Sequence, residues 1–340
     1  MIDLLVAGGG PAGLAAAVCG ALAGLETVVV EPREAPVDKA CGEGVMPGGV
    51  RALRELGVDL APAGGRELRG VHYTDGVHSV RAAFRDGPGL GVRRTGLHRA
   101  LWLRAGELGV RIVPGRVEDV RQEDDAVLAA GLRARWMIAA DGLHSPVRRA
   151  LGLQGPGHGT RRYGLRRHYR VAPWTDFVEV HWSPRGEAYV TPVGETLVGV
   201  AVLSAERRGF DAHLADFPHL AALLSGPAAG PVRGAGPLRQ RVRARVAGRV
   251  LLVGDAAGYV DALTGEGVAL AVASARAAVR CLVAGRPAAY EAAWRRLSRR
   301  HRLLTGALVR ASGRERTARL VVPVASRLPM VFGAAVRALR

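Results

Sequence analysis

Three glycine-and-acid motifs, spread across the chain in a fixed order, restrict its fold more than any other feature. They are Gly8–Gly13, Asp141–Ser145 and Gly254–Ala257. Each follows a short apolar run of the kind that forms a buried strand. Together they are expected to form one ligand site.

The first motif has the sequence context that makes a glycine motif informative. Asp3–Ala7 has the pattern of a buried strand, and the alanine-rich run Leu14–Ala23 has the pattern of a helix. Strand, Gly-x-Gly-x-x-Gly and helix is the order found in dinucleotide-binding folds. A second strand, Glu26–Glu31, ends in a carboxylate placed to bind a ribose diol. The segment therefore predicts dinucleotide binding.

The glycines of this motif have separate physical roles. Gly8 allows the tight turn, Gly10 lets a pyrophosphate approach the backbone, and Gly13 lets the helix lie close to the strand. The helix N-terminus then directs its N–H groups at the phosphate charge.

The third motif favours a flavin over a nicotinamide. Asp255 follows the strand Arg249–Val253, where its carboxylate can accept a hydroxyl proton from a ribityl chain. Gly265 and Gly267, on either side of Glu266, bring backbone N–H groups to a helix start. The second motif, Asp141-Gly142, is by itself typical of a turn.

The ordered trio resembles flavoproteins of the para-hydroxybenzoate hydroxylase fold, a superfamily of aromatic hydroxylases, geranylgeranyl reductases and flavin-dependent halogenases. The resemblance covers about the first three hundred residues and implies FAD as the cofactor, with NAD(P)H as a transient reductant. It assigns the pyrophosphate to the glycine motif, the adenosine ribose to Glu31, and adenine to the backbone at Val117. It also places Arg94 beside the flavin, although a solvated arginine is an equal alternative. The implied FAD-binding residues are Gly8, Gly10, Pro11, Ala12, Gly13, Glu31, Arg94, Val117, Asp141, Gly142, Gly254, Asp255, Gly265, Glu266 and Gly267.

The expected fold class is α/β. A Rossmann-like FAD-binding domain is predicted from residues 1–67, 86–157 and 246–290, and a mainly β substrate domain from 68–85 and 158–245. Alternating runs such as Phe177–Trp182 and Glu187–Val193 indicate the strands of the inserted sheet. Residues 291–340 are expected to form a basic helical segment.

Candidate catalytic groups lie in one loop and on the inserted sheet. The loop Asp38–Pro47 resembles a Cys-Gly loop that geranylgeranyl reductases and some polyketide hydroxylases carry near the flavin, so Cys41 is expected to line the active site and Glu43 to act as an acid or base. The alternative is that both side chains only support the loop. His168, Tyr169, His181, Trp182 and Tyr189 are candidates for the substrate surface, although packing is the favoured interpretation for each of them taken singly.

The predicted reaction is hydroxylation of a phenolic or polyketide-type aromatic substrate with O2 and NAD(P)H, through a flavin C4a-hydroperoxide. The chain departs from the Tyr-x-Trp-x-Phe-Pro pattern of geranylgeranyl reductases at Ala188–Pro192, and its single lysine, Lys39, makes a halogenase improbable. Arg161–Arg170 resembles actinobacterial hydroxylases of polyketide or phenolic-lipid secondary metabolism. The alternatives are a saturase of isoprenoid double bonds and a flavin-bound interaction protein without turnover.

The net charge of +18 does not indicate nucleic-acid binding. The chain has one lysine and no asparagine, so its arginines are explained by a GC-rich genome, and no nucleic-acid-binding motif accompanies them. Residues 291–340 nevertheless hold twelve arginines and two acids. This segment is expected to be a solvated helical face, with contact to an anionic membrane as the alternative. No metal-spaced cysteine pair and no secretory signal are recognised, so a cytoplasmic location, with or without membrane contact, is expected. The sequence does not define an oligomeric state.

Overall fold

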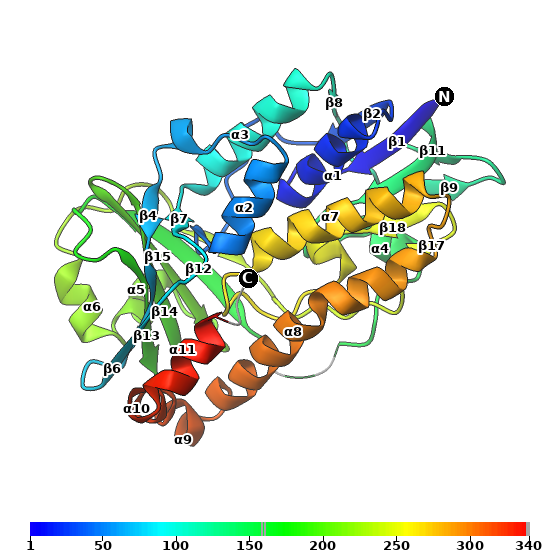
Figure 1. Cartoon of the computed structure of the whole chain (residues 1–340). Coiled ribbons are helices and arrows are strands. Elements are labelled where there is room, and N and C mark those ends of the chain that lie inside the picture. Colours follow the sequence, from blue (N-terminus) through cyan, green and yellow to red (C-terminus); the bar gives the residue numbers. More distant parts are fainter. Residues whose placement is uncertain (158, 160, 338–340) are drawn as a thin grey trace.

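The computed structural model of the protein describes residues 1–157, 159 and 161–337 (Figure 1). The predicted domain boundary at residue 158 and the last three residues of the predicted C-terminal segment lie outside the described residues. The chain forms two large sheets side by side, joined by a small third sheet and by long helices.

The first sheet has eight strands and the Rossmann-like order β17-β18-β11-β1-β2-β8, with β9 and β10 attached to β11. Strands β18, β11, β1, β2 and β8 run parallel, and β1 is central with partners on both sides. The side chains of β1, β2 and β18 are almost wholly buried, as their valine- and leucine-rich runs predict, whereas β8 at the sheet edge is partly exposed. The strands are β1 (Ile2–Ala7), β2 (Thr27–Glu31), β8 (Arg111–Pro114), β9 (Val120–Gln122), β10 (Val127–Ala129), β11 (Leu132–Ala139), β17 (Val246–Ala247) and β18 (Val250–Leu252).

Helices cover this sheet and place the motifs at its edge. Helix α1 packs against both α3 and α7, and α2 packs against α7. Proline at the first position of α1 fits a helix start, where a backbone N–H is not needed. The helical elements of this region are α1 (Pro11–Leu22), α2 (Pro47–Glu55), η1 (Ala61–Ala63), α3 (Arg94–Glu107), α4 (Pro146–Ala150), η2 (Gly254–Ala257) and α7 (Gly267–Val283).

The second sheet has seven strands in the order β16-β12-β15-β14-β13-β5-β6. It combines an early hairpin with strands formed much later in the chain, because β5 pairs in parallel with β13. Short helices, α5 (Phe210–Leu214) and α6 (Pro218–Leu223), cover one face. The strands are β5 (Gly70–Thr74), β6 (Ser79–Ala83), β12 (Tyr163–Tyr169), β13 (Phe177–Ser183), β14 (Gly186–Gly194), β15 (Leu197–Ser204) and β16 (Arg233–Ala235).

A three-stranded sheet and the C-terminal helices connect the two large sheets. The small sheet contains β3 (Gly44–Val45), β4 (Arg66–Leu68) and β7 (Gly89–Gly91). Helix α8 (Ala289–Ser312) begins beside β18, where the Tyr290 hydroxyl donates to the Leu252 carbonyl at 2.9 Å, and ends near the second sheet. Helices α9 (Glu315–Ala318), α10 (Val321–Arg327) and α11 (Pro329–Arg337) follow, and α10 and α11 pack against β6 (Figure 1).

The predicted fold class is confirmed: a Rossmann-like α/β domain, an inserted mainly β region and C-terminal helices are all present. The predicted strands at 3–7, 26–31, 177–182 and 187–193 agree with β1, β2, β13 and β14 to within one or two residues. The exact domain boundaries remain a prediction.

Candidate functional site

Four loops meet at one edge of the first sheet, where its parallel strands end. The glycine motif follows β1, Glu31 ends β2, Asp141 follows β11, and Asp255 follows β18. Ligands of open parallel sheets bind at this carboxyl edge. The fold therefore brings together the residues that the sequence assigned to FAD.

The glycine motif has the geometry that a pyrophosphate requires. Gly8 has a φ of 99°, and a Cβ on Gly13 would lie 1.8 Å from the Gly8 carbonyl oxygen, so only glycine lets α1 approach β1 this closely. A Cβ on Gly10 would meet no atom of the described residues within 4 Å. The backbone at Gly10 is thus open to a ligand at the positive end of α1.

Glu31 is buried and bound to the same motif. Its carboxylate accepts hydrogen bonds from the Gly9 N–H at 2.7 Å and from Arg33 Nε at 2.7 Å. Burial opposes ionisation, but the bonds from Arg33 and Gly9 outweigh it and lower the pKa of Glu31. Glu31 is therefore an ionised acceptor at the end of β2, consistent with recognition of ribose hydroxyls.

Charged side chains line an accessible space that is enclosed by protein. Asp255 and Lys39 are solvent-accessible, yet the surrounding protein raises the pKa of the Asp255 carboxyl and lowers the pKa of the Lys39 ammonium, in both cases mainly by desolvation. Asp141 lies beside them and also has a raised pKa because it is desolvated. Together these three residues mark the candidate cofactor site, here termed the cofactor cleft.

Arg94 contributes a buried cation at this cleft. It begins α3 and is 6% exposed, and its Nη1 has no hydrogen-bond partner among the described residues. Desolvation lowers the pKa of Arg94, as expected for a cation without a direct partner. A buried donor without an acceptor calls for a ligand. This observation fits an anionic or oxygen-rich cofactor such as FAD.

The remaining predicted cofactor residues lie around the same edge. Val117 is buried behind β8. Gly142, Gly254 and Gly265 all have positive φ angles, and Gly267 begins α7. The buried Glu266 contacts His301 Nδ1 of α8 at 3.1 Å, so α8 touches the predicted flavin loop.

Sequence reasoning missed the side chain that joins two of the motifs. Arg148 is fully buried and donates to the Leu143 carbonyl at 2.8 Å and the Ala256 carbonyl at 3.0 Å. It thereby connects the Asp141 loop to the Asp255 loop. Its position at the end of the second motif was the only available signal, and its partner is more than one hundred residues away in sequence.

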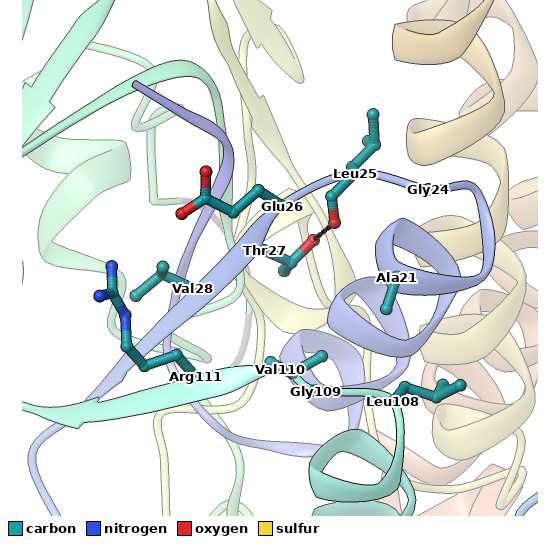
Figure 2. A pocket seen from close by; sticks show the side chains of 10 residues that line it. All are labelled: Ala21, Gly24, Leu25, Glu26, Thr27, Val28, Leu108, Gly109, Val110 and Arg111. Carbon is teal, nitrogen blue, oxygen red and sulfur yellow. Dashed lines mark hydrogen bonds between the residues drawn. The ribbon is translucent and has the colours of Figure 1, made fainter.

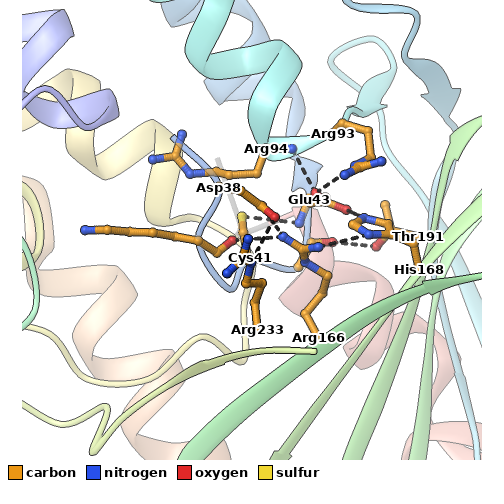
Figure 3. Close-up of polar contacts among 11 residues, drawn as sticks. Asp38, Cys41, Glu43, Arg93, Arg94, Arg166, His168, Thr191 and Arg233 are labelled. Carbon is orange, nitrogen blue, oxygen red and sulfur yellow. Dashed lines mark hydrogen bonds and ion pairs between the residues drawn. The ribbon is translucent and has the colours of Figure 1, made fainter. Parts of the chain in front are cut away.

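The Cys41 loop places its two candidate groups in different environments. Cys41 as a residue is partly exposed, whereas its thiol is desolvated, which raises the thiol pKa, so the thiol is protonated at neutral pH. Glu43 is 3% exposed and has a φ of 59°, which is rare for a residue with a side chain. Its carboxylate accepts from the Arg94 N–H at 2.8 Å and contacts His168 Nε2 at 2.5 Å (Figure 3).

Glu43 belongs to a buried chain of charged groups that crosses to the second sheet. Arg166 Nη1 lies 2.9 Å from His168 Nδ1, and Arg166 also binds Asp38, which in turn accepts from Arg233 at 3.2 Å (Figure 3). An arginine can only donate, so His168 Nδ1 is the acceptor and the ring carries its proton on Nε2. His168 therefore donates to Glu43, and neither side chain is free to exchange a proton with a ligand in this arrangement.

Tyr189 has a similar connecting role. Its hydroxyl donates to the Leu263 carbonyl at 3.0 Å, and burial raises its pKa well above the ordinary value. On the same face, Glu187 binds Arg162, whose Nη1 lies 3.6 Å from Asp261 Oδ2. These contacts tie β14 to the loop between η2 and α7. Catalytic roles for Glu43, His168 and Tyr189 stay predictions.

Strand alternation separates the other candidates on the sheet. Trp182 packs against Tyr73, with ring centroids 5.4 Å apart, on the face covered by the C-terminal helices. Tyr169 and His181 point to the opposite face, where Tyr169 packs under α5 and His181 contacts Glu179. Neighbouring strand residues alternate between faces, so Tyr169 and His181 lie on the face opposite Trp182, and a place for them on the substrate surface stays a prediction.

A separate pocket lies at the opposite edge of the first sheet. Figure 2 shows it between the end of α1 and the starts of β2 and β8, lined by Leu25, Glu26, Val110 and Arg111. It contains none of the motif residues and lies at the amino ends of the parallel strands. The position does not favour a cofactor site.

Comparison with known proteins identifies a family and several relatives. A family model described as an FAD binding domain matches residues 1–85 and 97–214. Menaquinone reductase of Mycolicibacterium smegmatis is 30% identical over 337 aligned residues, which span 88% of this chain and 80% of that protein. Digeranylgeranylglycerophospholipid reductase 1 of Methanothermobacter thermautotrophicus is 30% identical over 298 residues, 78% of this chain and 73% of that protein. A solved flavin-dependent brominase has a TM-score of 0.85 at 19% identity, covering 99% and 93% of the two chains, and shows the shared fold.

Proposed function

Because the chain belongs to the flavoprotein family with this FAD-binding domain and is an FAD-dependent oxidoreductase, we propose that it saturates a carbon–carbon double bond of a prenylated lipid. FAD is its cofactor, and NAD(P)H is the typical reductant of the family. The FAD supplies the hydride chemistry, and the protein supplies binding, orientation and a proton.

The observation that carries the proposal is the Cys41 thiol. Saturation of a double bond requires a hydride at one carbon and a proton at the other. Cys41 is partly accessible in the Asp38–Pro47 loop, and its raised pKa keeps the thiol protonated. The names of the two reductase relatives support the same reaction class.

The buried network behind the thiol has a positioning role in this proposal. Glu43 binds the start of α3 and His168 of β12, and the Glu43 N–H donates to Cys41 Sγ at 3.3 Å. Thr191 donates to the Gly42 carbonyl at 2.7 Å from β14. The loop is thus held by the start of α3 on one side and by the second sheet on the other, which restricts the direction of the thiol.

The test is anaerobic reoxidation of the reduced, FAD-loaded protein by prenyl quinones and geranylgeranyl lipids. We expect recovery of the oxidised flavin spectrum and a product that has gained two hydrogens. Cys41→Ala should lower kcat strongly while FAD content stays unchanged, and Cys281→Ala on α7 is the matched control. Equal turnover of Cys41→Ala and the wild type would remove the thiol from the mechanism.

Hydroxylation of a phenolic or polyketide-type substrate is the second candidate. The observation in its favour is that β14 carries the polar residues Glu187, Tyr189 and Thr191 on the face towards the flavin loop and lacks the Tyr-x-Trp-x-Phe-Pro pattern that geranylgeranyl reductases carry there. Because these side chains are bound to Arg162, Leu263 and Gly42, the support comes from the departure from the reductase pattern. O2 consumption coupled to an added oxygen in a phenol, without anaerobic reoxidation by prenyl lipids, would favour this candidate. A flavin that stays oxidised with NAD(P)H would favour the non-catalytic alternative.

A further inference from the structure

Five exposed apolar side chains gather on α10, on α11 and at the bend between them. They define the C-terminal patch: Leu320, Val324, Leu328, Met330 and Val331. Met330 is 85% exposed and Val331 is 62% exposed. Leu320, Val324 and Leu328 recur at every fourth position, so they form one stripe along α10. Apolar residues grouped in this way mark an interaction surface.

The inner face of the same helices is firmly packed, so the patch is not a frayed end. Val322, Phe332 and Val336 are buried in the core of the second sheet, and the Phe332 ring lies 4.8 Å from that of Tyr73. A helix packed on one side and facing water on the other is expected to be polar on its outer face. These helices are apolar on both faces.

The positive charge around the C-terminal patch favours an anionic partner. Five arginines are exposed on the same segment: Arg314, Arg316, Arg319, Arg327 and Arg337. Glu315 is the only acidic residue of the sequence after Glu291. Each arginine near an anionic membrane surface contributes about 1 kcal/mol of attraction. Glu315 pairs with Arg319, so the rim keeps an excess of positive charge. An apolar centre with a predominantly basic rim fits anionic lipid head groups better than it fits a second copy of this basic chain.

The helix geometry fits shallow insertion. Within the described residues no single helix is long and apolar enough to cross a membrane, but Glu315–Arg327 and Pro329–Arg337 together reach that length and composition with a bend of 100°. The bend carries Leu328, Met330 and Val331 at its outer corner. An amphipathic pair of this kind lies in the interface of a bilayer with its apolar side chains among the acyl chains.

We propose that the C-terminal patch docks the protein on an anionic lipid membrane. The same helices cover the apolar face of the second sheet, around Tyr73 and Trp182. Resting on the proposed function in this one respect, docking also brings the protein to the bilayer in which a prenylated substrate is dissolved.

The test is co-sedimentation of the FAD-loaded full chain with vesicles of phosphatidylcholine alone or mixed with phosphatidylglycerol. Binding to the mixed vesicles should exceed binding to phosphatidylcholine and weaken with salt. The double variant Met330→Asp/Val331→Asp should bind at least ~10-fold less, since it removes two apolar side chains worth about 1.5 kcal/mol each. Leu103→Asp on α3, where Leu103 is 55% exposed, is the matched control and should bind as the wild type does.

Three outcomes would overturn the proposal. They are a wild type that does not bind anionic vesicles, a double variant that binds equally well, and a double variant that instead dissociates a dimer seen by sedimentation velocity. FAD content and urea unfolding of each variant establish that it is folded. If vesicle binding is lost in the double variant but prenyl lipids never reoxidise the wild-type flavin, docking holds and the proposed reaction fails.

Discussion

The two sides of the cofactor cleft differ in the kind of group that forms them. On the FAD side, the backbone at Gly8, Gly10 and Gly13 shapes the site, and the charged side chains of Lys39 and Asp255 are exposed to solvent. On the side of the second sheet, the ionisable groups are buried and bound to one another, as with Glu43 and His168. The FAD side therefore offers groups to a ligand, whereas the ionisable groups on the side of the second sheet are engaged in contacts that hold the domains together.

The largest expected effect comes from a substitution that tests the backbone geometry on the FAD side. Gly13→Val places a side chain where even a Cβ would lie 1.8 Å from the Gly8 carbonyl oxygen, so α1 must move away from β1. We expect FAD affinity to fall by ~10³-fold, about 4 kcal/mol, measured by fluorescence titration of the apoprotein. Gly106→Ala in α3, where a Cβ meets no described atom within 4 Å, is the control. Normal FAD binding by Gly13→Val would show that the backbone is not the determinant.

The next largest effect is a loss of stability when the buried network around Glu43, on the side of the second sheet, is interrupted. Glu43→Ala leaves the His168 Nε2–H and the Arg94 N–H without their carboxylate acceptor, and each buried donor left unpaired costs about 1–3 kcal/mol. Glu43→Gly removes the same carboxylate but relieves the φ of 59°, so it should be about 1 kcal/mol more stable than Glu43→Ala. Urea unfolding measures both. The exposed pair of Arg319 and Glu315 is the control, because Arg319→Ala should cost less than about 1 kcal/mol.

The pH dependence of stability tests how the buried carboxyl of Glu187, on the side of the second sheet, affects the folded state. Desolvation raises the pKa of Glu187 from 4.5 to about 7, despite the opposing effect of Arg162. The folded protein therefore binds the Glu187 proton more tightly than the unfolded chain does. This binding contributes its full stability below pH 4.5, and the contribution is lost as the pH rises through about 7. Relative to Glu187→Gln, the wild type should lose about 3 kcal/mol of unfolding free energy between about pH 5 and about pH 8. Glu195→Gln, at an exposed carboxylate, should show no such difference.

The smallest expected effect concerns the accessible charges of the cofactor cleft. Lys39→Gln removes a cation near Asp255 and Gly142, and FAD affinity should fall by about 1 kcal/mol, roughly fivefold, at low salt. The difference should shrink as salt increases, because accessible charges are screened. Arg185→Gln at the exposed β13–β14 turn is the control. A loss of affinity that does not depend on salt would instead indicate a specific hydrogen bond.

The same contrast explains what the sequence could predict. The glycine motif, Glu31 and Asp255 belong to local patterns of strand, turn and helix, so their roles follow from neighbours along the chain. The pairing of Glu43 with His168 joins residues 125 positions apart, and Arg148 reaches Ala256 over 108 positions. No local pattern records such contacts. The alternating pattern likewise identified the strands that carry Tyr169 and His181, but it did not predict which face of the sheet each side chain occupies.

The parallel pairing of β5 with β13, covered by α10 and α11, has a consequence for synthesis of the chain. The apolar face around Tyr73 is translated early, but the strand beside it follows about one hundred residues later and Phe332 comes near the end of the described chain. A nascent chain on the ribosome therefore carries an uncovered, aggregation-prone sheet face for most of its translation. Ribosomes stalled before α11 should accordingly recruit holding chaperones to this sheet, while the glycine-motif domain is already compact.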